Sequence, residues 1–122
     1  MKLRIKGNSI RLRLSKKDVA TLHDEGMVAD RTSFGKNTLR YVLKQTDTAT
    51  ALTASFDNND ITVFIPASFV AGWPDNDIVG TDARMPLTGT DSLYILVEKD
   101  FVCLDETTED QSDNYANPNK SC

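Results

Sequence analysis

The segments at the start of the chain constrain the fold most, because apolar and basic residues alternate strictly along them. In residues 2–6 and 9–14 the apolar side chains fall on one face of an extended chain and the basic side chains on the other. A period of two is typical of strands with one buried face. Gly7 and Asn8 lie between the segments and suit a tight turn that needs a positive φ at its first central residue. The sequence therefore predicts a β-hairpin with a basic outer face. Its five cations are Lys2, Arg4, Lys6, Arg11 and Arg13.

A short helix is predicted directly after this hairpin. Ser15 is suited to cap the helix, with Asp18 at the position of the acidic partner in a capping box, and Gly26 is suited to end it. Two further strands are predicted at about 27–33 and 38–45, joined by the turn "FGKN".

The same pattern then starts again, which indicates an internal repeat. Strands are predicted in "TALTASF" and "ITVFI", a helix in "PASFVAGW" with Pro66 at its first position, and strands at about 77–84 and 92–99. A shift of 51 residues aligns the apolar positions, and "TLRYVLK" matches "SLYILVE" after three inserted residues. The aligned pairs are Ile10 with Ile61, Leu12 with Val63, Leu14 with Ile65, Val19 with Val70, Leu22 with Trp73 and Val28 with Val79. The alternative is chance similarity between two short β-rich stretches.

We therefore expect an α+β fold, mostly antiparallel, in which two strand-strand-helix-strand-strand repeats form one pseudo-twofold barrel or sheet. Its 122 residues suit one domain. That domain is predicted over residues 1–103, with halves at about 1–47 and 48–103, and a flexible acidic tail over 104–122. The predicted core consists of Leu12, Leu14, Val63, Ile65, Leu93, Ile95 and Val97.

Charge is distributed unevenly along the chain. Residues 1–44 carry eleven Lys/Arg and four Asp/Glu, a net charge of +7, whereas residues 45–122 carry three and fourteen, a net charge of −11. The first part can attract an anion and the second repels it. No apolar run approaches the roughly 20 residues of a membrane span, and no secretory signal is visible. With two cysteines and no CxxC motif, free thiols and a cytoplasmic location are expected.

The segment "GNSIRLRLSKKDVATLHDEGMV" resembles the AbrB/MazE swapped-hairpin family. Members have a Gly-Asn-Ser turn, an apolar-Arg-apolar strand end, usually a proline, a short helix and a strand of the "GDEV" kind. Gly7, Asn8, Ser9, Arg13 and Leu14 fit this pattern, and Ser15 replaces the proline. In the second half, "IPASF" and "DNDIV" look like the same helix start and strand entry. The resemblance covers about residues 2–99 and rests on short motifs.

Domains of that family pair as dimers into one β-barrel, so two units in one chain would imply a single-chain pseudo-dimer, with a monomer as its plausible state. The family binds DNA, often as an antitoxin whose acidic C-terminal tail grips a toxin. Asn8, Ser9 and Arg13 occupy positions that the family uses on DNA, but Ile5 replaces a residue that is typically basic there. The matching places in the second half are Asn59, Asp60 and Phe64. A palindromic operator needs two equivalent surfaces, and this chain offers one at best.

A second, narrower resemblance joins "KGNSIRLRLSK", "VEKDFVCLD" and the ending "EDQSDNYANPN". These segments are similar to a group of small bacterial proteins of no assigned function. This likeness implies a bacterial origin and a tail that belongs to the protein, but it implies no activity.

Catalytic or metal-binding residues are not predicted. The single histidine, His23, has no second histidine or ligand set near it in the sequence. Cys103 is followed by Asp105 and Glu106, which disfavour a reactive thiolate. Neither a phosphate-binding loop nor an EF-hand pattern is present, so no cofactor is expected. A disulfide between Cys103 and Cys122 is within reach of a mobile tail, but the expected compartment argues against it.

We therefore expect a non-enzymatic binding module, with an enzyme of unrecognised type as the least favoured option. The predicted anion-binding residues are Lys2, Arg4, Lys6, Asn8, Ser9, Arg11 and Arg13. Their partner is expected to be an acidic protein segment, and the nearest candidate is the chain's own tail. Its acidic residues are Asp105, Glu106, Glu109, Asp110 and Asp113. The alternatives are weak DNA binding by a transcriptional regulator or antitoxin-like protein, binding of small phosphates, or an ordinary solvated face in which long arginine stems cover the sheet.

Overall fold

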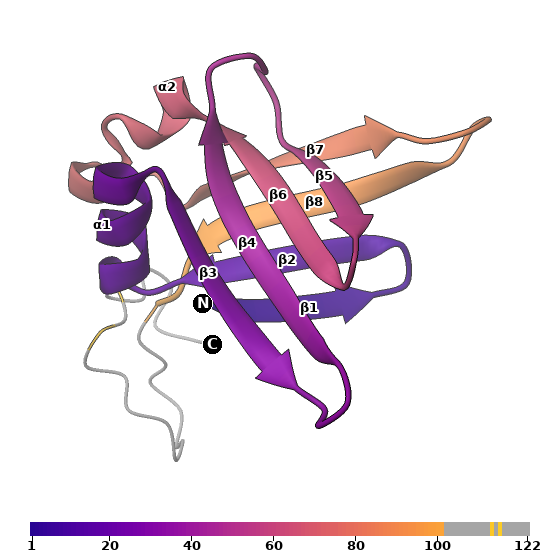
Figure 1. Ribbon diagram of the computed structural model, residues 1–122. Helices are drawn as coiled ribbons and strands as arrows, with labels where there is room; N and C mark the ends of the chain where they lie inside the picture. The colour runs from indigo at the N-terminus through magenta and orange to yellow at the C-terminus, as the bar shows by residue number, and fades with distance from the viewer. Residues whose placement is uncertain (102–112, 114, 116–122) are drawn as a thin grey trace.

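Two four-stranded β-sheets pack face to face in the computed structural model, which describes residues 1–101, 113 and 115 (Figure 1). Within these residues the chain forms eight strands, two α-helices and one 3₁₀ helix. The first half contains β1 (Lys2–Lys6), β2 (Ser9–Leu14), α1 (Lys16–Glu25), β3 (Met27–Ser33) and β4 (Thr38–Thr46). The second half contains β5 (Thr53–Asp57), β6 (Asp60–Pro66), α2 (Ala67–Val70), η1 (Trp73–Asp75), β7 (Gly80–Pro86) and β8 (Ser92–Lys99).

Each sheet combines a hairpin from one half with a hairpin from the other. The first sheet has the order β1-β2-β8-β7 and the second the order β3-β4-β6-β5. Neighbouring strands within a hairpin are antiparallel, whereas the hairpins meet through the parallel pairs β2–β8 and β4–β6. The expected α+β class and the mostly antiparallel pairing are therefore confirmed.

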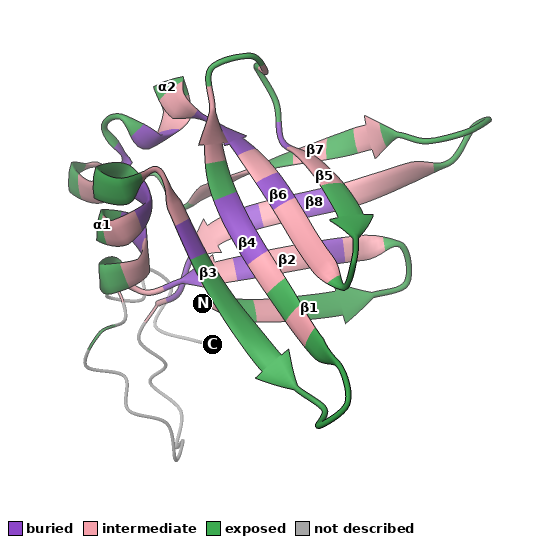
Figure 2. Ribbon diagram, viewed as in Figure 1, coloured by how far each residue is buried: buried purple, intermediate pink, exposed green. Residues whose placement is uncertain are grey.

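The core fills the space between the two sheets, and α1 and η1 close one end (Figure 2). Leu12, Val63 and Ile95 are fully buried, and so are most of the other residues predicted for the core. Leu93 is the exception, because it pairs with Met85 close to the β7–β8 turn and is only partly buried. Trp73 of η1 and Leu22 of α1 are also fully buried and complete the core at this end.

Local signals around α1 act as the sequence predicts. Gly7 has φ of 53° in the first turn, and Gly26 ends the helix with φ of 82°. The Ser15 hydroxyl accepts a hydrogen bond from the Asp18 backbone N–H at 3.2 Å, and the Asp18 carboxylate accepts one from the Ser15 N–H at 3.0 Å. This is a complete capping box.

Replacement of Ser15 by alanine should therefore lower the free energy of unfolding by about 1 kcal/mol. The N–H of Asp18 then loses its acceptor at the start of α1. Urea denaturation of the variant measures this change. Ser68→Ala, at an exposed position in α2, is the matched control. Equal unfolding midpoints for the two variants would show that the cap does not stabilise the helix.

The second half departs from the predicted boundaries before β7. The predicted single helix is divided into α2 and η1, and Pro66 precedes the first helical residue instead of occupying it. β7 begins at Gly80 and not near residue 77, because Trp73 Nε1 donates to the Ile78 carbonyl and the Asn76 side chain accepts from the Ile78 N–H. Val28 lies opposite Leu43 in the first half. Thr81, and not the Val79 that a shift of 51 aligns with Val28, lies opposite Val97 in the second half.

No helix in the described part of the chain combines the length and apolar character needed to cross a membrane.

Candidate binding surfaces

The predicted basic ladder lies on the outer face of the β1–β2 hairpin. Lys2 lies opposite Arg13 and Arg4 opposite Arg11, the pairing that a two-residue turn implies. The alternate residues of β2 point into the core, so the basic side chains face away from it. Like charges placed directly opposite each other destabilise a strand pair unless another group compensates.

Strand β8 and the residue that follows it supply this compensation for one end of the ladder. The Arg13 Nε lies 2.8 Å from the Glu98 carboxylate, and the Arg11 Nε lies 3.8 Å from the same oxygen. Lys2 Nζ lies 3.0 Å from the Asp100 carboxylate. Sequence analysis missed both acids, because only the long-range parallel pairing of β2 with β8 brings them beside the ladder.

The other end of the ladder stays open. Arg4, Lys6, Arg11 and Ser9 surround a shallow depression of about 140 Å³, and we call this set the basic face. Arg4 and Lys6 are exposed, and neither forms an ion pair with any of the described residues. The Ser9 hydroxyl donates to the Lys6 carbonyl at 2.6 Å. Arg4 and Lys6 can therefore accept an anion without first breaking an ion pair to a described residue, whereas Arg11 also lies within 3.8 Å of Glu98.

Asn8 is engaged in the fold. Its side-chain amide donates to the Ser92 carbonyl at 2.7 Å, and its own carbonyl accepts from the Tyr94 N–H. Both contacts fasten the first turn to β8. The structure thus gives Asn8 a positioning role next to the basic face.

An aromatic residue and a further cation extend the basic face onto β8 and β7. The register places Tyr94 beside Ser9 and Arg84 beside Tyr94. The Arg84 guanidinium lies 5.0 Å from the Tyr94 ring centroid, and the Tyr94 hydroxyl donates to Asp82 at 2.8 Å. This hydrogen bond raises the pKa of Tyr94. Neither residue was predicted, because their place beside Ser9 follows from strand order alone.

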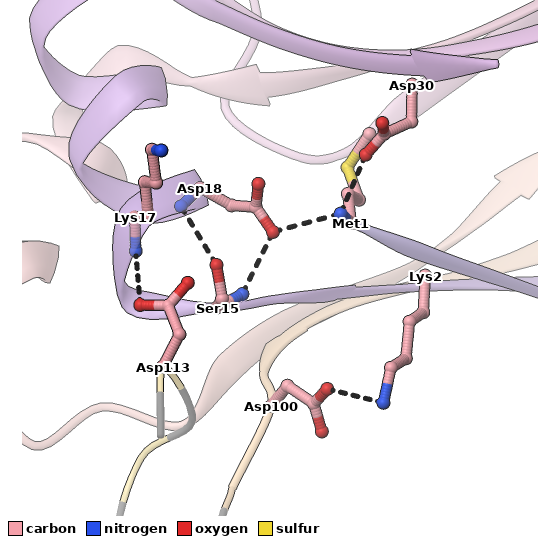
Figure 3. A network of polar contacts seen from close by, with 8 residues as sticks. All are labelled: Met1, Lys2, Ser15, Lys17, Asp18, Asp30, Asp100 and Asp113. Atoms are coloured by element: carbon pink, nitrogen blue, oxygen red, sulfur yellow. Dashed lines mark hydrogen bonds and ion pairs between the residues drawn. The ribbon is translucent and has the colours of Figure 1, made fainter. Parts of the chain in front are cut away.

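A second polar cluster lies at the start of α1 (Figure 3). The Met1 amino group lies 2.7 Å from the Asp30 carboxylate and 3.0 Å from the Asp18 carboxylate. Burial lowers the pKa of this amino group, but its hydrogen bonds to Asp30 and Asp18 outweigh burial and raise the pKa overall. The cluster fixes the first residue of the chain between α1 and β3.

The described part of the predicted acidic tail contacts α1. The Lys17 N–H donates to the Asp113 carboxylate at 3.3 Å (Figure 3). The Lys16 N–H donates to the Asp113 carbonyl at 3.0 Å. We predicted that the tail contacts the basic ladder. Asp113, which is a described residue of the tail, contacts the start of α1 instead. The other predicted acids lie outside the described residues, as do both cysteines. These acids are Asp105, Glu106, Glu109 and Asp110.

The ring of Tyr115 lies over a buried lysine, Lys99. Lys99 is only 4% exposed. Its ammonium group donates to the Asn76 carbonyl at 2.7 Å and lies 5.7 Å from the centre of the Trp73 ring. The Tyr115 ring lies 4.9 Å away from the same ammonium and meets Phe101 edge-on. Burial lowers the pKa of Lys99 and raises that of Tyr115.

His23 is exposed, and its Nδ1 lies 2.9 Å from the Asp24 carboxylate, whose hydrogen bond raises the pKa of the imidazole. In the described ranges no three His, Cys, Asp or Glu side chains are grouped so that they could hold a metal ion.

The fold and these surfaces define a small two-sheet protein with a one-sided basic face. Residues 1–119 match a family of unknown function, DUF7009, and the chain belongs to this family. No curated protein and no solved structure matches it.

Proposed function

We propose that this protein is a non-enzymatic binding module whose basic face takes an acidic segment of another protein. The observation that carries the proposal is the open end of the ladder. Arg4 and Lys6 stand around a depression and have no carboxylate partner among the described residues, whereas Lys2 and Arg13 at the other end are neutralised by Asp100 and Glu98. If this face only contacted solvent, leaving one end of the ladder without acids would be unfavourable, because Arg4 and Arg11 repel each other across the strands.

We also propose that the architecture is an AbrB-like pseudo-dimer within one chain. The register supports it: Leu12 pairs with Val97 across the first parallel contact, and Leu43 pairs with Val63 across the second. A shift of 51 relates Leu12 to Val63, and the inserted three residues relate Leu43 to Val97. Each strand of the first sheet then has a counterpart in the second.

The pseudo-twofold relation also argues against DNA as the main partner. The places that correspond to the basic face in the second half are occupied by Ser55, Asp57, Asp60 and Thr62. A twofold-symmetric duplex site would meet carboxylates where its second half needs cations. We accordingly favour an acidic polypeptide, and we place its encounter with this chain in the cytoplasm.

Titration with a labelled glutamate-rich peptide at low and high salt tests the proposal. Arg4→Ser combined with Lys6→Ser should weaken binding about tenfold at low salt, since each exposed pair contributes up to about 1 kcal/mol. Lys36→Ser combined with Arg31→Ser makes the same change in charge on the β3–β4 hairpin and should leave binding nearly unchanged. Equal losses in the two double variants would contradict a defined basic face. Tighter binding to duplex DNA than to the peptide would favour the regulator instead.

A further inference from the structure

Asp113 and Tyr115 contact two neighbouring parts of the fold, the start of α1 and the residues that follow β8. The first N–H groups of a helix lack intrahelical acceptors, and Ser15 satisfies the one at Asp18. Those of Lys16 and Lys17 are satisfied by Asp113, through its carbonyl and its carboxylate. A carboxylate here also meets the positive end of the helix dipole.

The contacts of Tyr115 lie beside this helix end. The Tyr115 N–H donates to the Asp100 carbonyl at 2.8 Å, and Tyr115 forms a parallel bridge with Phe101. Its ring lies 6.1 Å from the Phe101 ring and meets two ammonium groups, Lys99 at 4.9 Å and Lys16 at 5.8 Å. Cations near an aromatic ring are attracted by its electron-rich face. These contacts hold an aromatic ring two residues after a carboxylate.

We infer that this is a peptide-binding site for an Asp-X-Tyr motif, and that Asp113 and Tyr115 fill it as a releasable intramolecular ligand. Specific contacts go to both ends of the motif: backbone N–H groups to the aspartate, and a strand edge, a ring and two cations to the tyrosine. Asp113 itself remains exposed, so its hydrogen bonds compete with water. This site is separate from the basic face, and the inference is independent of the proposed function.

A tethered ligand occupies its site at a high effective concentration, so a free peptide competes poorly with it. The test therefore uses the full chain with Asp113→Ala and Tyr115→Ala as the receptor. The probe is a synthetic peptide with the sequence EDQSDNYAN, which is that of residues 109–117. It should shift the backbone amide signals of Lys16, Lys17 and Lys99 saturably, and it should bind the unaltered chain about tenfold more weakly.

Two lysine variants separate recognition from folding. In the same receptor, Lys16→Gln removes a cation that faces the tyrosine ring and should weaken the peptide several-fold. Lys36→Gln removes the same charge from the turn between β3 and β4, away from the contacts of Asp113 and Tyr115, and should leave the peptide affinity unchanged. A probe with both motif residues changed to alanine should cause no shifts. Equal binding to receptor and unaltered chain, shifts confined to residues 4–11, or no shifts at millimolar peptide would overturn the inference.

Discussion

Replacement of Ile65 by alanine should lower the free energy of unfolding by about 2 to 5 kcal/mol. Ile65 lies near the end of β6, is fully buried, and belongs to the core that the two sheets share. Alanine would remove three carbons from a closely packed interior and leave a cavity that neighbouring strands cannot fill. The loss is a large share of the roughly 5 to 15 kcal/mol that stabilises an ordinary domain. Equilibrium denaturation followed by the fluorescence of Trp73 measures it.

Ile5→Ala provides a matched control for this prediction. Ile5 also lies in a strand, but its side chain is 58% exposed. The same truncation there removes little buried surface, and we expect a change below about 1 kcal/mol. If Ile65→Ala unfolded at the same denaturant concentration as Ile5→Ala, this would contradict the burial of Ile65 and the register assigned to β6.

Replacement of Gly80 by alanine should destabilise the protein by about 1 to 3 kcal/mol or more, although it adds a single methyl group. A Cβ at this position would lie 2.2 Å from the Val97 carbonyl oxygen and 2.8 Å from the Glu98 Cα. Both are backbone atoms of β8, so the clash is relieved only if β7 moves away from β8. That movement strains the hydrogen bond from the Lys99 N–H to the Val79 carbonyl.

Gly72→Ala separates this steric effect from the general cost of altering a glycine. A Cβ at Gly72 would meet only the Asn76 side chain, at an ordinary 3.7 Å. We expect thermal unfolding of Gly72→Ala close to that of the unaltered chain and a clearly lower midpoint for Gly80→Ala. Identical midpoints would show that β7 and β8 are farther apart than the structure places them.

Features determined by short segments could be predicted from the sequence. The alternation in residues 2–14, the glycine turn and the Ser15–Asp18 box each depend on residues a few positions apart. The strand order could not be read in this way, because nothing local in β2 specifies β8 as its neighbour.

The candidate sites could likewise be predicted only where they depend on residues that are close together in the sequence. The five cations were assigned to one face from their spacing, but the acids that neutralise Lys2 and Arg13 come from the far end of the chain. The docking of Tyr115 depends on Lys99 and Phe101, and no pattern in the sequence relates these residues to α1. The start of β7 was misplaced because the Trp73–Ile78 hydrogen bond holds the preceding segment out of the sheet.

The interleaving of the hairpins also determines the order in which the two sheets can be completed. All strands of the second sheet lie between residues 27 and 66, so this sheet can form while the rest of the chain is still being synthesised. The first sheet joins residues as distant as Arg13 and Glu98, which are 85 positions apart. Such contacts raise the contact order and slow folding. Until β8 emerges, the edge of β2 that faces away from β1 stays unpaired beside an apolar face, and this exposes that part of the nascent chain to aggregation.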